Sequence, residues 1–91
     1  MVDATWLAGA IQTVDEGIAD KMVDGKTAVY RVGDITRVDM RAEDAAALVG
    51  ENWLTMAMHA VQQGVADKLI KENVAVYRIK NIIRVDIKPE K

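Results

Sequence analysis

The chain has 91 residues, carries a formal net charge of −2, and is 51% hydrophobic and 29% charged. This composition is typical of one small folded domain, and it excludes a disordered chain or a protein that is basic overall and coats nucleic acid. The chain has no cysteine, no serine and one histidine. Their scarcity excludes disulfides, zinc–thiolate sites and the commonest nucleophiles. We therefore expect a non-catalytic protein with no catalytic residue, no metal site and no cofactor.

The distribution of charge and hydropathy along the chain sets further expectations. No run of 18 apolar residues is present, and the amino terminus lacks the basic flank of a signal peptide. We therefore expect a cytoplasmic protein with no membrane partner. Charge is uneven, because residues 1–47 hold nine acidic and five basic side chains, whereas residues 48–91 hold five and seven.

Two long stretches of the chain repeat each other. Residues 4–40 align without a gap with residues 51–87, at an offset of 47, and 16 of the 37 aligned pairs are identical. This extent of identity predicts a tandem duplication. We therefore expect a single domain over residues 1–91, made of two repeats joined by a connector at residues 41–50. Identical pairs include Trp6/Trp53, Gly17/Gly64, Tyr30/Tyr77, Arg37/Arg84 and Asp39/Asp86.

Each repeat opens with apolar residues at helical spacing. In the first repeat the stripe steps by three or four residues, and Asp24-Gly25 follows it as a typical helix end. An equivalent stripe lies 47 residues further along the chain, so we predict one helix in each repeat. The stripes consist of Leu7, Ile11, Val14, Ile18 and Met22, and of Leu54, Met58, Val61, Val65 and Leu69.

Alternating apolar and polar residues follow each predicted helix. In the first repeat they flank Gly33-Asp34, a pair typical of a two-residue hairpin turn, and in the second they flank Lys80-Asn81. Each repeat is therefore predicted to be a helix followed by a β-hairpin. The four predicted strands are residues 27–32, 35–40, 74–79 and 82–87.

The predicted fold class is α+β, with the order α-β-β-α-β-β, a pseudo-two-fold axis and an antiparallel sheet packed on the helices. The simplest layout joins both hairpins in one four-stranded sheet with both helices on one face. An alternative keeps the hairpins apart at opposite ends of the helix pair. The connector contains the helix-forming stretch Glu43–Leu48, which forms either a short helix of its own or a backward extension of the second helix through Gly50.

A second stripe beside the core stripe begins with a tryptophan and ends with a glycine. Trp6 and Gly17 share one face of the first predicted helix, and Trp53 and Gly64 share the same face of the second. Small residues at helical spacing allow another helix to approach closely. These four residues therefore predict helix–helix packing between the repeats. A ligand pocket lined by tryptophan and packing between chains are the alternatives.

Two-residue turns would fix which residues face each other across each hairpin. Val29 then lies opposite Val38, and Val76 opposite Val85, on the face toward the core. The other face pairs a tyrosine with an arginine in each hairpin and ends in β-branched residues near the turns. Its candidate interaction residues are Tyr30, Val32, Ile35, Arg37, Tyr77, Ile79, Ile82 and Arg84.

Exposed β-branched residues at the end of a sheet face usually mark an interface. We therefore predict a non-catalytic interaction or structural module whose partner is another protein or a second copy of the chain in a homo-oligomer. Aromatic and arginine side chains on a sheet also serve single-strand nucleic-acid recognition, which is the alternative function. Asp39 and Asp86 beside the arginines disfavour nucleic acid as the partner, because they weaken the positive field that such a surface needs.

A third possibility comes from a family resemblance over roughly residues 4–50. The segment Gly25-Lys26, the turn at Gly33-Asp34 and the acidic–alanine stretch Ala42–Leu48 resemble the small phage head–tail joining proteins. The resemblance implies a helix–hairpin–helix layout and a structural role in a phage particle. It assigns no role to an individual residue.

Overall fold

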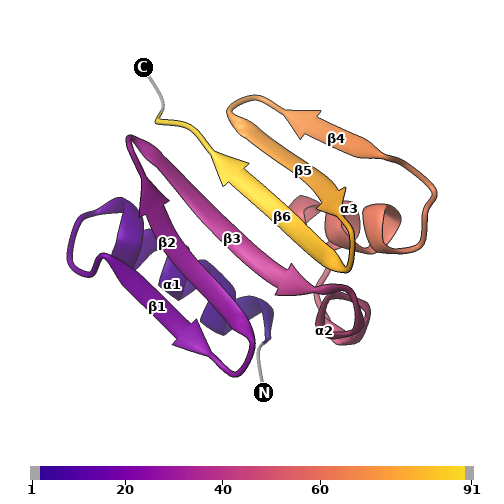
Figure 1. The fold of residues 1–91 in the computed structure, drawn as a ribbon, viewed down its shortest axis with the longest axis horizontal. Helices are drawn as coiled ribbons and strands as arrows, with labels where there is room; N and C mark the ends of the chain where they lie inside the picture. The colour runs from indigo at the N-terminus through magenta and orange to yellow at the C-terminus, as the bar shows by residue number, and fades with distance from the viewer. Residues whose placement is uncertain (1–2, 90–91) are drawn as a thin grey trace.

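The computed structural model describes residues 3–89 as an antiparallel sheet with helices on one side (Figure 1). The predicted α+β class is confirmed. The strands lie in the order β1-β2-β3-β6-β5-β4. In chain order the elements are α1 (Ala4–Asp15), β1 (Lys21–Asp24), β2 (Thr27–Val32), β3 (Ile35–Arg41), α2 (Ala42–Ala47), α3 (Trp53–Gln62), β4 (Lys68–Lys71), β5 (Val74–Ile79) and β6 (Ile82–Ile87).

Both predicted hairpins belong to this one sheet. β3 pairs antiparallel with β6, and Val38 lies opposite Val85 at the middle of that pairing. The expected four strands were too few, because β1 and β4 add a short strand at each edge. Figure 1 shows β1 and β4 at opposite edges of the sheet, with β3 and β6 side by side at its centre.

Both helices are shorter than the apolar stripes predicted. α1 ends at Asp15 and α3 at Gln62, each followed by a glycine, Gly17 or Gly64, with φ of +80°. This left-handed conformation suits glycine and ends a helix. The predicted mid-helix position of these glycines was therefore wrong. Among the described residues, no heavy atom other than chain neighbours lies within 4 Å of the place where a β-carbon would be added to either glycine.

The end of each helix is held by an arginine from the sheet. Arg31 of β2 donates from Nη1 to the carbonyl oxygen of Val14 at 3.3 Å, and Arg78 of β5 donates to that of Gln62 at 2.9 Å. Arg31 Nη1 also donates to the Asp15 carbonyl oxygen at 3.3 Å. The arginines thus bind carbonyl groups of the last helical turn, where a helix has no intrahelical donors left. Trp6 and Trp53 lie half-buried against the core.

The connector forms a short helix of its own, α2, and does not extend α3. The chain becomes extended at Leu48, with φ −68° and ψ 134°. α3 then begins after Asn52, whose side chain accepts a hydrogen bond from the Thr55 amide at 2.8 Å. His59 in α3 contacts the connector, since its Nε2 lies 2.7 Å from the Leu48 carbonyl oxygen.

The core lies between the helices and one face of the sheet. Val29, Val38, Val76 and Val85 are each 0% exposed, which confirms the predicted core face and the register behind it. Helices α1, α2 and α3 all contribute buried residues to the same cluster. No helix within residues 3–89 combines the length and the apolar composition needed to cross a membrane.

Candidate interaction surface

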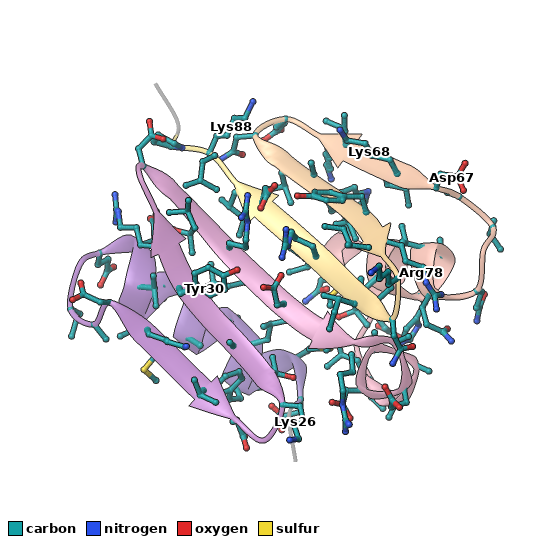
Figure 2. The ribbon with its side chains drawn as sticks, viewed as in Figure 1. Lys26, Tyr30, Asp67, Lys68, Arg78 and Lys88 are labelled. Carbon is teal, nitrogen blue, oxygen red and sulfur yellow. The ribbon has the colours of Figure 1, made fainter. Side chains whose placement is uncertain are left out.

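Within residues 3–89, the opposite face of the sheet has no helix over it, and its side chains are seen from the front in Figure 2. We call it the open face. Every fully buried strand residue points to the helices, so the open face holds only half-buried or exposed side chains. It has a polar centre, consisting of Tyr30, Arg37, Asp39, Tyr77, Arg84 and Asp86. It also has an apolar border, consisting of Val23, Val32, Ile35, Ile70, Ile79 and Ile82.

Two arginine–aspartate pairs join the hairpins across the polar centre. Arg37 Nε donates to Asp86 Oδ1 at 2.7 Å, and Arg84 Nε donates to Asp39 Oδ1 at 2.6 Å. Both pairs link β3 to β6, where Arg37 lies opposite Asp86 and Asp39 opposite Arg84. The sequence placed these groups on one face, but it did not reveal these pairs, because it did not indicate which strands of the two hairpins lie side by side.

Each carboxylate of the polar centre also accepts a hydrogen bond from a tyrosine. The Tyr30 hydroxyl donates to Asp39 Oδ2 at 2.6 Å, and the Tyr77 hydroxyl donates to Asp86 Oδ2 at 2.6 Å. The predicted positions of Tyr30 opposite Arg37 and of Tyr77 opposite Arg84 are confirmed by the register. The tyrosine hydroxyl groups therefore already have partners inside the protein.

The pKa values in the polar centre follow from this bonding. Burial alone would raise the pKa of Asp86, but hydrogen bonds from Arg37 and Tyr77 lower it below its ordinary value. Burial raises the pKa of Tyr77, and its bond to Asp86 raises it further. The hydrogen bond to Asp39 raises the pKa of Arg84. Near neutral pH, Asp86 is therefore ionised, Tyr77 is neutral and Arg84 is charged.

The apolar border consists of one pair of residues at each end of the open face and one residue on each edge strand. Val32 lies opposite Ile35, and Ile79 opposite Ile82, as the two-residue turns predict. Val32 is 40% and Ile79 38% exposed, whereas Val23 and Ile70 on the edge strands are 57% and 64% exposed. The sequence interpretation missed Val23 and Ile70 because it predicted no strand there.

Four further basic side chains, Lys21, Arg41, Lys68 and Lys88, complete the open face. Strand alternation places Lys21, Arg41 and Lys68 on the same side as the polar centre. Lys88, just after β6, lines the same pocket as Lys68 and Tyr77. Arg41 is held near α2, with its Nε 3.5 Å from an Asp44 oxygen. Lys68 Nζ lies 5.6 Å from the centre of the Tyr77 ring. Among the described residues, the open face thus has six basic side chains against two carboxylates, in a chain whose net charge is −2.

Comparisons with protein-family models, with curated proteins and with solved structures find no match to this chain. The resemblance to phage head–tail joining proteins therefore stays a hypothesis. Within residues 3–89, no three histidine or acidic side chains lie together in a way that could hold a metal ion.

Proposed function

We propose that this protein is a non-catalytic interaction module that binds another protein through its open face. The observation that carries the proposal is the one-sided arrangement of the helices. All of them pack on one face of a six-stranded sheet, which leaves the other face uncovered with an apolar border. Val32 and Ile35 lie at one end of this face, and Ile79 and Ile82 lie at the other. Exposed apolar side chains on an uncovered sheet face are typical of a protein interface.

The internal ion pairs of the polar centre keep the desolvation penalty small when a partner covers it. Its two arginines are already paired with its two aspartates, and the four side chains are 16–24% exposed. A partner that covers them removes little remaining hydration and leaves no buried charge unpaired. Favourable free energy then comes from the apolar border, including Ile70 at 64% exposed.

The size of the open face suits a protein partner. Four strands of six or seven residues and two strands of four residues, spaced about 4.8 Å apart with about 3.3 Å per residue, span roughly 520 Å². A specific interface of standard size buries about 800 Å² on each partner. The open face and the turns around it therefore supply an area near the lower end of that class.

Nucleic acid fits this surface less well. Arg37 and Arg84 are each bound to an aspartate, and the hydroxyls of both tyrosines are bound as well. A single-strand platform needs positive charge available for phosphates and aromatic faces available for bases. The border offers branched aliphatic side chains, which favour a protein partner.

We further propose that the module arose by tandem duplication and has a pseudo-two-fold axis at its centre. Support comes from contacts that recur at an offset of 47 residues. This offset relates β3 to β6, the strand with which it pairs, and it relates Val38 to Val85, the residue that lies opposite it. The two tyrosine–aspartate bonds recur at the same offset, both at 2.6 Å. We call residues 47 positions apart counterparts.

Selection from a library of random displayed peptides tests the binding proposal. Peptides enriched on the native chain are expected to lose binding to the double variant Val32→Gln/Ile79→Gln, in which the border is less apolar and the charge is unchanged. Ile18→Gln/Val65→Gln is the matched control. These aliphatic side chains are 74% and 77% exposed, and they lie in the α1–β1 and α3–β4 loops rather than on the open face.

Binding to the control variant should be unchanged. If the enriched peptides bind all three proteins equally well, the open face is not the binding surface. Failure to enrich any peptide on the native chain would also count against the proposal.

A further inference from the structure

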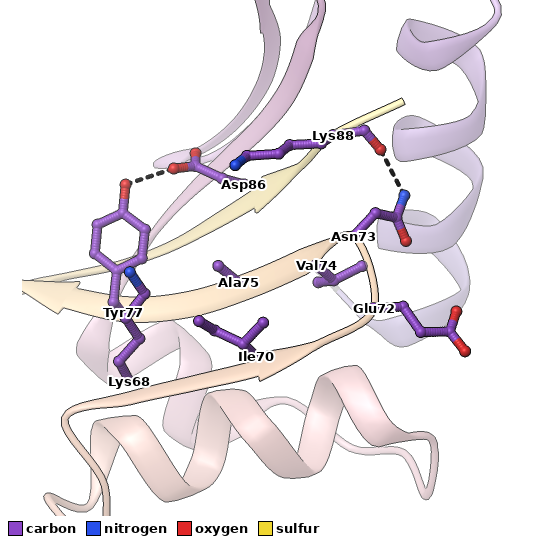
Figure 3. A pocket seen from close by; sticks show the side chains of 9 residues that line it. All are labelled: Lys68, Ile70, Glu72, Asn73, Val74, Ala75, Tyr77, Asp86 and Lys88. Carbon is purple, nitrogen blue, oxygen red and sulfur yellow. Dashed lines mark hydrogen bonds between the residues drawn. The ribbon is translucent and has the colours of Figure 1, made fainter. Parts of the chain in front are cut away.

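We infer that a pocket at the β4 end of the open face binds a carboxylate group of an acidic, extended segment of a partner protein. The inference rests on the proposed function and deepens it by naming the chemistry of the partner. The pocket has a volume of about 260 Å³ and lies over β4, β5 and the end of β6 (Figure 3).

The pocket combines an apolar floor with two basic side chains. Ile70, Ala75 and Tyr77 line it from β4 and β5, and Lys68 and Lys88 line it from opposite sides. In Figure 3 the Lys68 side chain lies beside the Tyr77 ring, while Lys88 extends over the pocket toward Asp86. A ligand that joins an aliphatic group to a carboxylate matches these two kinds of lining.

The backbone that carries Lys88 is held in place. The side chain of Asn73 donates from Nδ2 to the Lys88 carbonyl oxygen at 2.5 Å, and the Lys88 amide donates to the Asn73 carbonyl oxygen at 2.9 Å. This pair of bonds joins the end of β6 to the turn between β4 and β5. Less ordering is therefore needed when a ligand binds.

The two lysines remain available to an anion. Two carboxylates, Glu72 and Asp86, also line the pocket. The oxygens of Asp86 are bound by Arg37 and Tyr77, and the Glu72 side chain extends away from both lysines in Figure 3. Among residues 3–89, neither Lys68 nor Lys88 lies within 4.0 Å of a carboxylate oxygen. An incoming carboxylate therefore does not have to displace an existing ion pair.

The other end of the open face is different and provides an internal comparison. The counterparts of Lys68 and Lys88 are Lys21 and Arg41. Arg41 Nε lies 3.5 Å from Asp44 and 3.7 Å from Glu43, so its charge already has partners from α2. The available pair of cations occurs at the β4 end.

The edge position of β4 argues for an extended polypeptide as the ligand. β4 is the outermost strand of the described sheet, so one side of its backbone has no strand partner among residues 3–89. An extended segment can pair with such an edge and present alternate side chains to the open face. A segment with aliphatic and acidic residues then places a carboxylate between the lysines and an aliphatic group against Ile70.

Fluorescence anisotropy tests the inference in the native chain. The probe is a labelled eight-residue peptide of alternating glutamate and valine, at about 50 mM salt, where charge interactions are weakly screened. Binding to Lys68→Ala/Lys88→Ala is expected to be about tenfold weaker, because two exposed ion pairs are lost. The control is Lys21→Ala/Lys26→Ala, which removes the same charge at the β1 end and should bind within about twofold of the native chain. A peptide of alternating glutamine and valine lacks carboxylates. It should therefore bind the native chain about tenfold more weakly than the glutamate peptide does.

Several results would overturn the inference. They are no binding of the glutamate peptide, equal binding of the glutamine peptide, or an equal loss in both lysine variants. Tighter binding of a ten-nucleotide thymidine strand that needs the same lysines would assign the pocket to nucleic acid instead. If the selected peptides need Val32 and Ile79 but not Lys68 and Lys88, the proposed function stands and this inference fails. If the selected peptides bind equally well after Val32 and Ile79 are replaced, the proposed function itself fails.

Discussion

Thr27 at the start of β2 has a polar group inside the core. The residue is 0% exposed, and among the described residues its hydroxyl has no hydrogen-bond partner. Such a group loses hydration on folding and gains nothing in return. Its counterpart is Val74, which has nearly the same shape and no hydroxyl.

Thr27→Val is therefore expected to raise the free energy of unfolding by about 1 kcal/mol, as measured by urea denaturation. Thr36→Val is the control, because Thr36 is also buried but its hydroxyl lies 3.5 Å from an Asp15 carboxylate oxygen. The control should gain less than Thr27→Val. Lower stability for Thr27→Val would show that its hydroxyl has a partner, such as a buried water.

Two turn residues adopt a backbone conformation that favours glycine. Glu72 and Lys80 both have φ of 54°, whereas their counterparts Gly25 and Gly33 are glycines with φ of 61° and 62°. A residue with a β-carbon is strained in this region by roughly 1–2 kcal/mol. Glycine removes the strain but loses more entropy on folding.

Lys80→Gly is therefore expected to stabilise the protein by roughly 0.5–1 kcal/mol, which thermal denaturation would show as a higher midpoint. The reverse change, Gly33→Lys, should lower the midpoint, since it places a β-carbon at the same turn position of the other hairpin. A lower midpoint for Lys80→Gly would mean that the strain is smaller than the entropy cost.

At the level of elements, the β3–β6 junction depends on the two arginine–aspartate pairs. Asp86 has a pKa below its ordinary value of 3.8 in the folded protein. A lowered folded pKa means that ionised Asp86 stabilises the fold above pH 3.8, and that this contribution is lost as the pH falls through the lower folded value.

Asp86→Asn is expected to cost roughly 1–3 kcal/mol at pH 7, because Arg37 loses a charged partner while half-buried. The difference in unfolding free energy between native and variant should shrink as the pH falls below 3.8. Asp34→Asn in the exposed β2–β3 turn is the control, with little change at pH 7. A difference that stays constant down to acid pH would contradict this assignment.

Alternation and turn residues predicted both hairpins and their register, since Val29, Val38, Val76 and Val85 are all buried as expected. The edge strands were missed because Met22 and Leu69 continue the helical spacing of the stripes before them. Four-residue strands give too little alternation to outweigh that pattern. Gly25-Lys26, the turn between β1 and β2, was a signal for β1, because two-residue hairpin turns often begin with glycine. Gly17 was a signal for the end of α1.

For the candidate site, as for the fold, the sequence indicated the features within each hairpin but not those between elements. All eight predicted interaction residues lie on the open face, because strand alternation fixes which side each one occupies. The arginine–aspartate pairs depend on contacts between hairpins, and the Lys68–Lys88 pocket depends on β4. Neither can be read from one hairpin in isolation.

At the scale of the whole molecule, the two halves meet mainly where β3 pairs with β6, apart from contacts that α2 makes with α3 and β6. Because Asp86 is the counterpart of Asp39, two copies of the first half can form the same bonds through β3, with Arg37 of one copy bound to Asp39 of the other. Each half alone is too small to bury an adequate core.

We therefore expect residues 1–47, expressed alone, to fold only as a homodimer, with helical and strand signals in circular dichroism that disappear together on dilution. Sedimentation equilibrium measures the association. Full-length protein at the same concentrations is the control and should keep its signal on dilution. A monomeric half that unfolds cooperatively would contradict both this expectation and the proposed origin by duplication.

The central pairing of Val38 with Val85 also has a consequence for concentrated solutions. The contacts that close one chain are equally available between the first half of one molecule and the second half of another. Two chains that separate at α2 can therefore exchange halves and form an intertwined dimer with no new type of contact. A short tether gives the halves of one chain a local concentration on the order of millimolar. Protein concentration, relative to that value, therefore determines whether a molecule closes on itself or is shared between two chains.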